Sequence, residues 1–260
     1  MSARIPMVAP GRAAVGRGVA GMHVAPDGSS ELVDEARAGE LVTVLADRSG
    51  WSFVQGPDLY FGWIRREDLV EVAERRAQRL VTVPFAEVRE RADHDAPVRD
   101  RLPAGVPVHV VAQHGPWLEI ASGGWVVTGH TAHLSELPAR APLPEDLLAT
   151  AEAYLGVPYL WGGTTHEGID CSGLVQTVFR LNGIALPRDA DQQAVTGRPS
   201  AGAASPGDLL FFGAERVTHV ALSAGGRDFI HAPMRGGVVE RARLDGDRTL
   251  LAVRRYLPER

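Results

Sequence analysis

An internal repeat in the first half of the chain limits what this part can fold into. Residues 38–51 contain an Ala-Gly pair, an apolar run and a tryptophan, and residues 104–117 repeat that pattern at an offset of 66 positions. Short alternating apolar runs bounded by Gly, Pro, Asp and Ser are typical of strands joined by turns. We therefore predict two small β-barrels of about 60 residues each in tandem.

Each copy of the repeat ends in a Gly-Trp-apolar triplet, at 62–64 and 124–126. The offset there is 62, so the first copy carries four extra residues, which we place around 56–60. Tyr60 lies in this insertion and has no counterpart in the second copy. We interpret most of the tryptophans in the repeat as core and turn aromatics.

The boundaries between domains are marked by composition. A proline-rich stretch at 138–144 breaks the barrel pattern and is typical of a linker, and a helical run with acidic residues in its first turn follows it. We predict a first barrel with an N-terminal extension at 1–72, a second barrel at 73–137, and a third domain at 145–260.

Composition excludes several classes of protein. The net charge of −5 comes without a basic stripe, which argues against a nucleic-acid partner. No apolar run approaches the roughly 18 residues of a membrane span, and a single cysteine excludes an internal disulfide. The first 22 residues lack an apolar signal core, so we expect a cytoplasmic protein, or a secreted one if a leader has been removed.

The only cysteine lies in the densest motif of the chain. Cys171 follows Gly-Ile-Asp and precedes a run whose apolar residues recur at helical spacing up to Gly183. A thiol at a helix N-terminus is expected to have a lowered pKa, which favours a nucleophile. The alternative is a buried structural cysteine, the more usual role of a lone cysteine.

A base for such a nucleophile is expected on a predicted β-hairpin. His219 and His231 lie in two short strands joined by a turn with Gly225 and Gly226. If the pairing centres on Gly225, the two histidines face each other directly and form a base and its orienting partner. The alternatives are polar residues on half-buried strands, or a Cys-His-His zinc site, for which no fourth ligand is evident.

Six short motifs of the third domain occur in an order that resembles the NlpC-type (NlpC/p-sixty) family of papain-like cysteine peptidases. The motifs are residues 159–163, 170–173, 186–192, 206–212, 218–221 and 229–232. The resemblance implies a papain-like α+β domain with Cys171 as nucleophile, His219 as base and His231 as the third member of the triad. The overall fold class is then α+β, with two small barrels ahead of the peptidase domain.

The front half resembles bacterial SH3-like domains. Two of these before an NlpC-type domain resemble the γ-D-glutamyl-L-diamino acid endopeptidases, which act on cell-wall peptides with a free N-terminal L-Ala. In that group, a tyrosine and an acidic residue of the first barrel bind the amine. The resemblance assigns the tyrosine to Tyr60, and we favour Glu31 for the acidic residue. Its rivals are Asp34, Glu35 and Asp58.

The resemblance also implies further contacts with the substrate. Asp170 corresponds to the third ligand of the amine, and charge-assisted hydrogen bonds suit an ammonium. Tyr159 and Trp161 are expected to line the cleft. Ser172, Arg188 and Asp189 are expected to contact the peptide. Arg188 suits a bidentate grip on the D-Glu α-carboxylate, and the alternative is an ordinary loop ion pair of Arg188 with Asp189.

Together these observations predict a cysteine endopeptidase of murein recycling that cleaves the γ-D-glutamyl-L-diamino acid bond, with diaminopimelate or lysine as the third residue. We expect no cofactor, no metal, no nucleic-acid or membrane partner, and a monomer. The alternatives are a secreted hydrolase that remodels polymeric peptidoglycan, a wall-binding module with an idle thiol, and a thiol acyltransferase on the same fold.

Overall fold

The computed structural model describes residues 7–16, 18–72, 77–136, 141–200, 202–234, 236–246 and 248–258. The chain divides into two compact units, Met1–Glu136 and Leu137–Arg260. Residues 138–140 of the predicted linker lie outside the described residues. Its last residue, Pro144, is the first residue of a helix.

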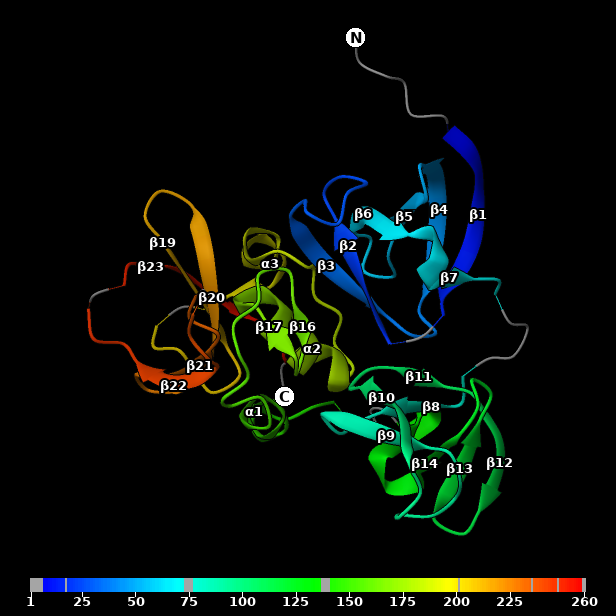
Figure 1. Cartoon of the computed structure of the whole chain (residues 1–260). Helices are drawn as coiled ribbons and strands as arrows, with labels where there is room; N and C mark the ends of the chain where they lie inside the picture. The colour runs from blue at the N-terminus through cyan, green and yellow to red at the C-terminus, as the bar shows by residue number, and fades with distance from the viewer. Residues whose placement is uncertain are drawn as a thin grey trace. The chain divides into compact units, whose positions relative to one another are not determined.

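The first copy of the repeat forms one seven-stranded antiparallel sheet in the order β3-β2-β6-β5-β4-β1-β7 (Figure 1). Its core includes Val15, Val42 and Ile64. Strand β1 pairs with β4 and β7, so part of the N-terminal extension belongs to the sheet. The elements are β1 (Met7–Val15), β2 (Val19–His23), β3 (Leu32–Arg37), β4 (Leu41–Arg48), β5 (Trp51–Gln55), β6 (Phe61–Arg65), the 3-10 helix η1 (Arg66–Asp68) and β7 (Leu69–Val70).

The second copy forms a five-stranded sheet, β10-β9-β14-β13-β12, and a three-stranded sheet, β11-β8-β15. Its buried core includes Val81, Val88, Leu118 and Val126. The elements are β8 (Arg79–Val81), β9 (Phe85–Arg89), β10 (Val98–Pro103), β11 (Pro107–Val108), β12 (Val110–His114), β13 (Trp117–Ile120), β14 (Trp125–Val127), η2 (Thr128–His130), β15 (Thr131–His133) and η3 (Leu134–Glu136).

The four extra residues of the first copy lengthen a hairpin and leave its turn unchanged. Trp51 pairs with Arg65 in the first copy, and Trp117 pairs with Val127 in the second, so the first hairpin has two more residue pairs. Both turns span five residues and carry the same hydrogen bonds, Gly56 N to Tyr60 O at 2.8 Å and Ile120 N to Gly124 O at 3.1 Å.

The prediction that the insertion occupies 56–60 is therefore wrong, because a hairpin takes up extra residues in pairs along its strands. Tyr60 has a structural counterpart, Gly124, at the same position of the turn. At this position of the turn the first copy carries a tyrosine side chain and the second copy carries none.

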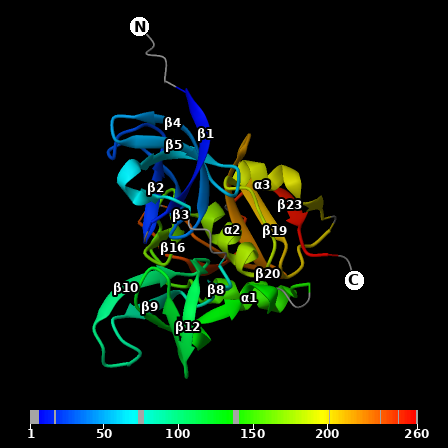
Figure 2. The same ribbon diagram turned by 90° about the vertical axis from the view of Figure 1, so that its right-hand side faces the viewer.

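The second unit packs three helices on a six-stranded sheet in the order β18-β23-β19-β20-β21-β22, with a separate β16–β17 ribbon (Figures 1 and 2). The elements are α1 (Pro144–Glu152), β16 (Thr164–Thr165), β17 (Gly168–Ile169), α2 (Cys171–Leu181), α3 (Ala190–Thr196), β18 (Arg198–Pro199), β19 (Leu209–Gly213), β20 (Val217–Gly225), β21 (Asp228–His231), β22 (Glu240–Arg243) and β23 (Leu250–Arg255).

Helix α2 is the centre of this unit. Leu174, Val178 and Phe179 on α2 are fully buried against Val220 and Leu222 of β20. Gly183 ends the helix with φ of 79°, a conformation that glycine adopts without strain. The packing brings the N-terminus of α2, with Cys171, against β20, the strand that carries His219.

These elements confirm the predicted fold class, two SH3-like β domains followed by an α+β domain. The helix predicted after residue 144, the helix from Cys171 and the β20–β21 hairpin are all present. Across the ranges given above, the helices are too short to span a bilayer.

Candidate active site

Cys171 is the first residue of α2, as predicted, and is 8% exposed. Burial raises the pKa of its thiol to about 12, and the negative charge of Asp170 adds to the rise. Backbone hydrogen bonds at Val220 and Ser172 and the charge of Arg188 act in the opposite direction, with less effect. The expectation of a lowered pKa is therefore wrong, since desolvation outweighs the helix N-terminus. At neutral pH the thiol keeps its proton.

Asp170 caps α2 and holds the surrounding loops together. Its Oδ1 accepts from Gly173 N at 2.6 Å and from Ser172 Oγ at 3.2 Å, and its Oδ2 accepts from Gly162 N at 2.8 Å. The guanidinium of Arg188 adds two more hydrogen bonds, at 3.0 and 2.7 Å. Five donors occupy about four lone-pair sites of the carboxylate, which leaves little room for the substrate ammonium assigned to Asp170.

Glycines in the two motifs let these loops approach each other. A Cβ on Gly173 would lie 2.3 Å from Gly163 O, and one on Gly163 would lie 2.5 Å from Gly168 O. Cβ atoms in proteins do not approach other atoms this closely. A side chain at either position would therefore displace the backbone carbonyl that it meets. This explains why glycines punctuate both segments that surround Asp170.

Arg188 is 1% exposed, and its guanidinium donates to both oxygens of Asp170 and to Ser172 Oγ. The grip on a substrate carboxylate and the pairing with Asp189 were the two expected roles. The structure pairs Arg188 with Asp170, 18 residues earlier in the chain. Asp189 precedes α3, and its amide donates to Gln192 Oε1 at 3.4 Å.

The two histidines are hydrogen-bonded to each other. The distance from His219 Nε2 to His231 Nδ1 is 2.8 Å, and the rings meet edge to face. Both lie on the sheet face that carries Phe212 and Phe229, with which they make ring contacts. The sequence-based prediction that they share a face and touch is thus confirmed.

The register between their strands differs from the expected one. Strands β20 and β21 pair Leu222 with Ile230 and Ser223 with Phe229, and an irregularity follows before Gly225. Along this register, His231 lies opposite residue 221 rather than opposite His219. A shift of two residues keeps both side chains on one face, because side chains alternate with period two.

Burial keeps both imidazoles neutral. The pKa of His219 is lowered to about 4, mainly by burial and also by the nearby positive charge of Arg248, while Asp170 opposes the shift. Burial likewise lowers the pKa of His231 to about 3, with added effects of His219 and Arg248. The resting site therefore holds a neutral thiol and two neutral imidazoles, and the thiol meets the backbone of Val220, the residue after His219.

The other predicted substrate residues are spread over both units. Tyr159 is half-buried and is bridged to Ile169, while Trp161 is 53% exposed, and Ser172 is buried beside Asp170. Glu31 is exposed just before β3, and Tyr60 is half-buried in the turn between β5 and β6. These two residues belong to the first unit, and their role toward the substrate stays a prediction.

Sequence reasoning missed three residues near the site. Gln193 is fully buried and donates to Ser172 O and Pro187 O. Glu240 and Arg248 approach the two nitrogens of His231. Glu240 could have been found from the strand that follows β21, since the two are cross-strand neighbours. Arg248 lies outside any regular element and gives no periodic signal.

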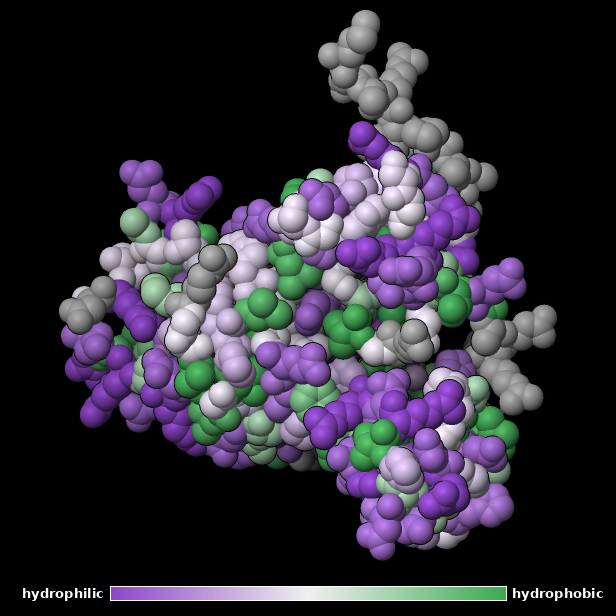
Figure 3. Space-filling view, in the orientation of Figure 1, coloured by the Kyte–Doolittle hydropathy of each residue, from purple (hydrophilic) through white to green (hydrophobic). Residues whose placement is uncertain are grey.

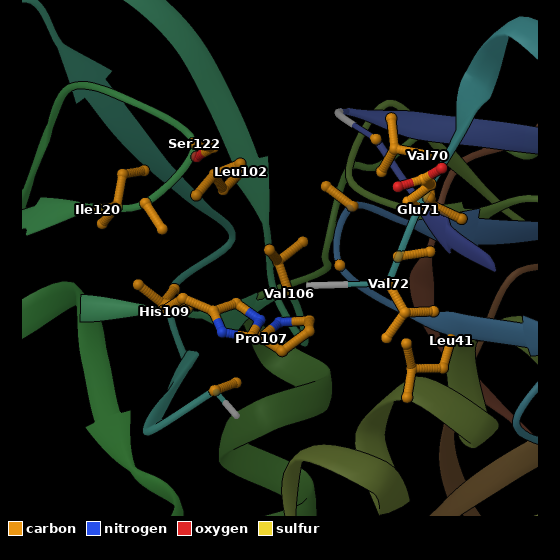
Figure 4. Close-up of a pocket in the computed structure, with 18 of the residues that line it drawn as sticks. Leu41, Val70, Glu71, Val72, Leu102, Val106, Pro107, His109, Ile120 and Ser122 are labelled. Atoms are coloured by element: carbon orange, nitrogen blue, oxygen red, sulfur yellow. The ribbon is translucent and has the colours of Figure 1, made fainter. Parts of the chain in front are cut away.

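A second candidate site is a cavity of about 840 Å³ in the first unit, lined by residues of both barrels (Figure 4). Apolar side chains such as Leu41, Val72 and Leu102 form much of its wall. None of the residues predicted to be catalytic lines it.

The zinc alternative is not supported by the geometry. His219 Nε2 and His231 Nδ1 face each other at hydrogen-bond distance instead of converging on a common point. Within the described part of the chain, no group of three His, Cys, Asp or Glu side chains is arranged to hold a metal ion.

Three family models match the chain in the order of the observed domains. Residues 156–252 match the NlpC/P60 family, residues 22–69 the bacterial dipeptidyl-peptidase Sh3 domain, and residues 82–131 the bacterial SH3 domain.

Relatives share this arrangement over most of their length. Dipeptidyl-peptidase 6 of Lysinibacillus sphaericus is 30% identical over 251 residues, which cover 87% of this chain and 89% of that protein. The γ-D-glutamyl-L-lysine dipeptidyl-peptidase of Bacillus subtilis (strain 168) is 29% identical over 85% of this chain and 80% of its own. An NlpC/P60 family protein of Bacillus cereus ATCC 10987 shares the fold, with a TM-score of 0.86 at 23% identity over 95% of this chain and all of that one.

The chain belongs to the NlpC/P60 family, a family of cysteine peptidases.

The buried Arg188–Asp170 pair can be tested by stability. We predict that Arg188→Leu lowers the free energy of unfolding by about 3–5 kcal/mol, because it leaves a buried carboxylate without its counterion. The control is Arg241→Leu, which breaks a half-exposed pair with Glu152 in the same unit and should cost less than about 1 kcal/mol. Urea unfolding followed by circular dichroism measures both, and equal losses in the two variants would contradict the assignment.

Proposed function

We propose that this protein is a cysteine endopeptidase that hydrolyses the bond between γ-D-glutamate and the diamino acid of murein peptides with a free N-terminal L-Ala. The observation that supports it best is the His219–His231 hydrogen bond beside a buried thiol at a helix N-terminus. The substrate class is proposed by similarity to the γ-D-glutamyl-L-lysine dipeptidyl-peptidase of Bacillus subtilis.

The first step is attack of the thiol on the carbonyl group of the scissile bond. Sγ of Cys171 attacks the γ-carbonyl carbon of D-Glu while His219 takes the thiol proton, and backbone amides in the first turn of α2 stabilise the oxyanion. Because the thiol pKa is about 12 and that of His219 about 4, the free enzyme holds a neutral pair rather than a thiolate and an imidazolium. The proton therefore moves as the carbon–sulfur bond forms.

The second half of the reaction uses the same proton. His219 donates it to the nitrogen of the departing diamino acid, and the C–N bond breaks. His219 then removes a proton from water, whose oxygen attacks the thioester carbonyl. The C–S bond breaks, the D-Glu γ-carboxylate is released, and the proton passes from His219 back to Sγ of Cys171. The hydrogen bond between His219 Nε2 and His231 Nδ1 holds the ring of His219 in place throughout.

The first barrel is proposed to select the free amine. Tyr60 is a turn residue whose counterpart in the second barrel is Gly124, so only the first barrel carries a side chain there. Together with a carboxylate, for which we retain Glu31, it would bind the ammonium of L-Ala. Polymeric peptidoglycan has this nitrogen in an amide bond, so the selection fits murein recycling, and we propose a cytoplasmic monomer without cofactor or metal.

Removing the nucleophile tests the mechanism. We predict that Cys171→Ala lowers kcat on L-Ala-γ-D-Glu-diaminopimelate by more than about 10³-fold, measured as released diaminopimelate by mass spectrometry. Turnover by the alanine variant close to that of the wild type would overturn the mechanism.

The amine pocket is tested by binding of the same free peptide. Tyr60→Phe and Glu31→Gln should each raise KM by about tenfold, the effect of losing a hydrogen bond to a charged group. The matched control is Glu67→Gln, an exposed carboxylate of η1 in the same barrel, which should leave KM within about twofold. An unchanged KM in both pocket variants would remove these residues from the site.

The low pKa of His219 predicts an acid-stable activity. Activity requires neutral His219, so kcat/KM should fall only as pH drops through about 4, rather than near the ordinary histidine value of 6.5. In the unfolded chain both histidines protonate near 6.5, so the native state loses stability as pH falls from about 6.5 towards 4. Circular dichroism at each pH separates unfolding from titration, and an acid limb near 6.5 in folded enzyme would contradict the prediction.

A further inference from the structure

His231 is bracketed by two oppositely charged side chains. Its Nδ1 lies 3.2 Å from Nη1 of Arg248, and its Nε2 lies 3.5 Å from Oε1 of Glu240. The ring itself is completely buried. A neutral imidazole carries one proton on one of its two nitrogens, so these neighbours decide which nitrogen carries it.

Arg248 determines the state of Nδ1. A guanidinium can only donate hydrogen bonds, so the nitrogen that faces it must present a lone pair. The guanidinium also lies over the ring of Phe229 at 5.7 Å, a contact that holds it next to His231. His231 Nδ1 is therefore unprotonated.

This state of His231 sets the proton of His219. A hydrogen bond between two nitrogens needs one proton, and His231 Nδ1 has none, so His219 Nε2 carries it. Because His219 is neutral at neutral pH, its Nδ1 then has no proton. The lone pair needed to accept the thiol proton of Cys171 is thus on Nδ1 of His219.

Glu240 faces Nε2, the second ring nitrogen of His231. The proton of His231 must be on Nε2, and this buried atom has no hydrogen-bond partner among the described residues. Glu240 is its cross-strand neighbour on β22, half-exposed, and its carboxylate can only accept. Figure 3 shows hydrophilic side chains over β22, which the strand order places at the edge of the sheet.

We propose that Arg248 and Glu240 are positioning residues that fix His231 as its Nε2–H tautomer and thereby leave Nδ1 of His219 as the base. The inference rests on the proposed function of Cys171 and His219. Neither residue contacts the reacting atoms in this scheme, and both act through the orientation of the two rings.

The tautomer can be observed directly, without substrate. Long-range ¹H–¹⁵N correlation spectra of the ¹⁵N-histidine-labelled chain at pH 7 distinguish protonated from bare ring nitrogens, and His231→Gln identifies the signals among the nine histidines. We expect His231 protonated only on Nε2 and His219 only on Nε2. In Arg248→Met combined with Glu240→Ala, the two nitrogens of His231 should shift towards the average of two tautomers.

Kinetics separate positioning from other roles. The double variant should lower kcat by about tenfold or more with KM within about twofold. Arg248→Lys and Glu240→Gln, which keep a donor and an acceptor, should restore most of the loss. The control is Arg243→Met. Arg243 is an exposed arginine of β22, the strand of Glu240, and it pairs with Asp228, so its removal should change neither kcat nor KM.

Three results would overturn the inference. One is a proton on His231 Nδ1 in the wild-type protein. Another is a double variant with the wild-type tautomer and kcat. The third is a rise in KM at unchanged kcat, which would make Arg248 a ligand of a substrate carboxylate. The spectra need no substrate, so they test this inference even if the murein peptide proves to be the wrong substrate.

Discussion

The active site depends on one buried carboxylate. Asp170 caps helix α2, receives amides of Gly162 and Gly173, and pairs with the buried guanidinium of Arg188. These contacts join the loop before the ribbon, the helix and the loop before α3, which fixes the place of Cys171. Two buried charges are stable only because each satisfies the other and the remaining hydrogen bonds are made. The motif residues around the cysteine therefore hold Cys171 in place through contacts within the protein, independently of any contact with a substrate.

The same burial sets the chemistry of the resting site. Desolvation raises the pKa of the thiol and lowers the pKa of both histidines, so all three groups are neutral at neutral pH. A neutral site needs its protons in defined places, because an imidazole with the wrong tautomer presents N–H instead of a lone pair to the thiol. The direction of the His219–His231 hydrogen bond is thus as important as its length, and the charged neighbours of His231 give it that direction.

Sequence patterns predicted the local features, and tertiary contacts decided the rest. The helix from Cys171 and the shared face of the two histidines follow from periods of 3.6 and 2, so they were predictable. The exact register was not, because the β20–β21 pairing is displaced by two residues from one centred on Gly225 and includes an irregularity between Ser223 and Gly225. Burial of the thiol reverses the expected pKa shift, and Arg188 finds its partner 18 residues away. Neither effect leaves a periodic signal in the chain, and Arg248 lies in an irregular segment that has none.

The central claim, a peptidase for free murein peptides, is tested most directly by one digestion with two substrates in parallel. The enzyme is incubated with L-Ala-γ-D-Glu-diaminopimelate and with its N-acetylated form, and released diaminopimelate is measured by mass spectrometry. The account predicts release from the free peptide alone, since the proposed amine pocket needs an ammonium. Equal cleavage of both peptides would contradict the amine pocket. Cleavage of neither, repeated with L-lysine in place of diaminopimelate, would contradict the proposed peptidase activity itself.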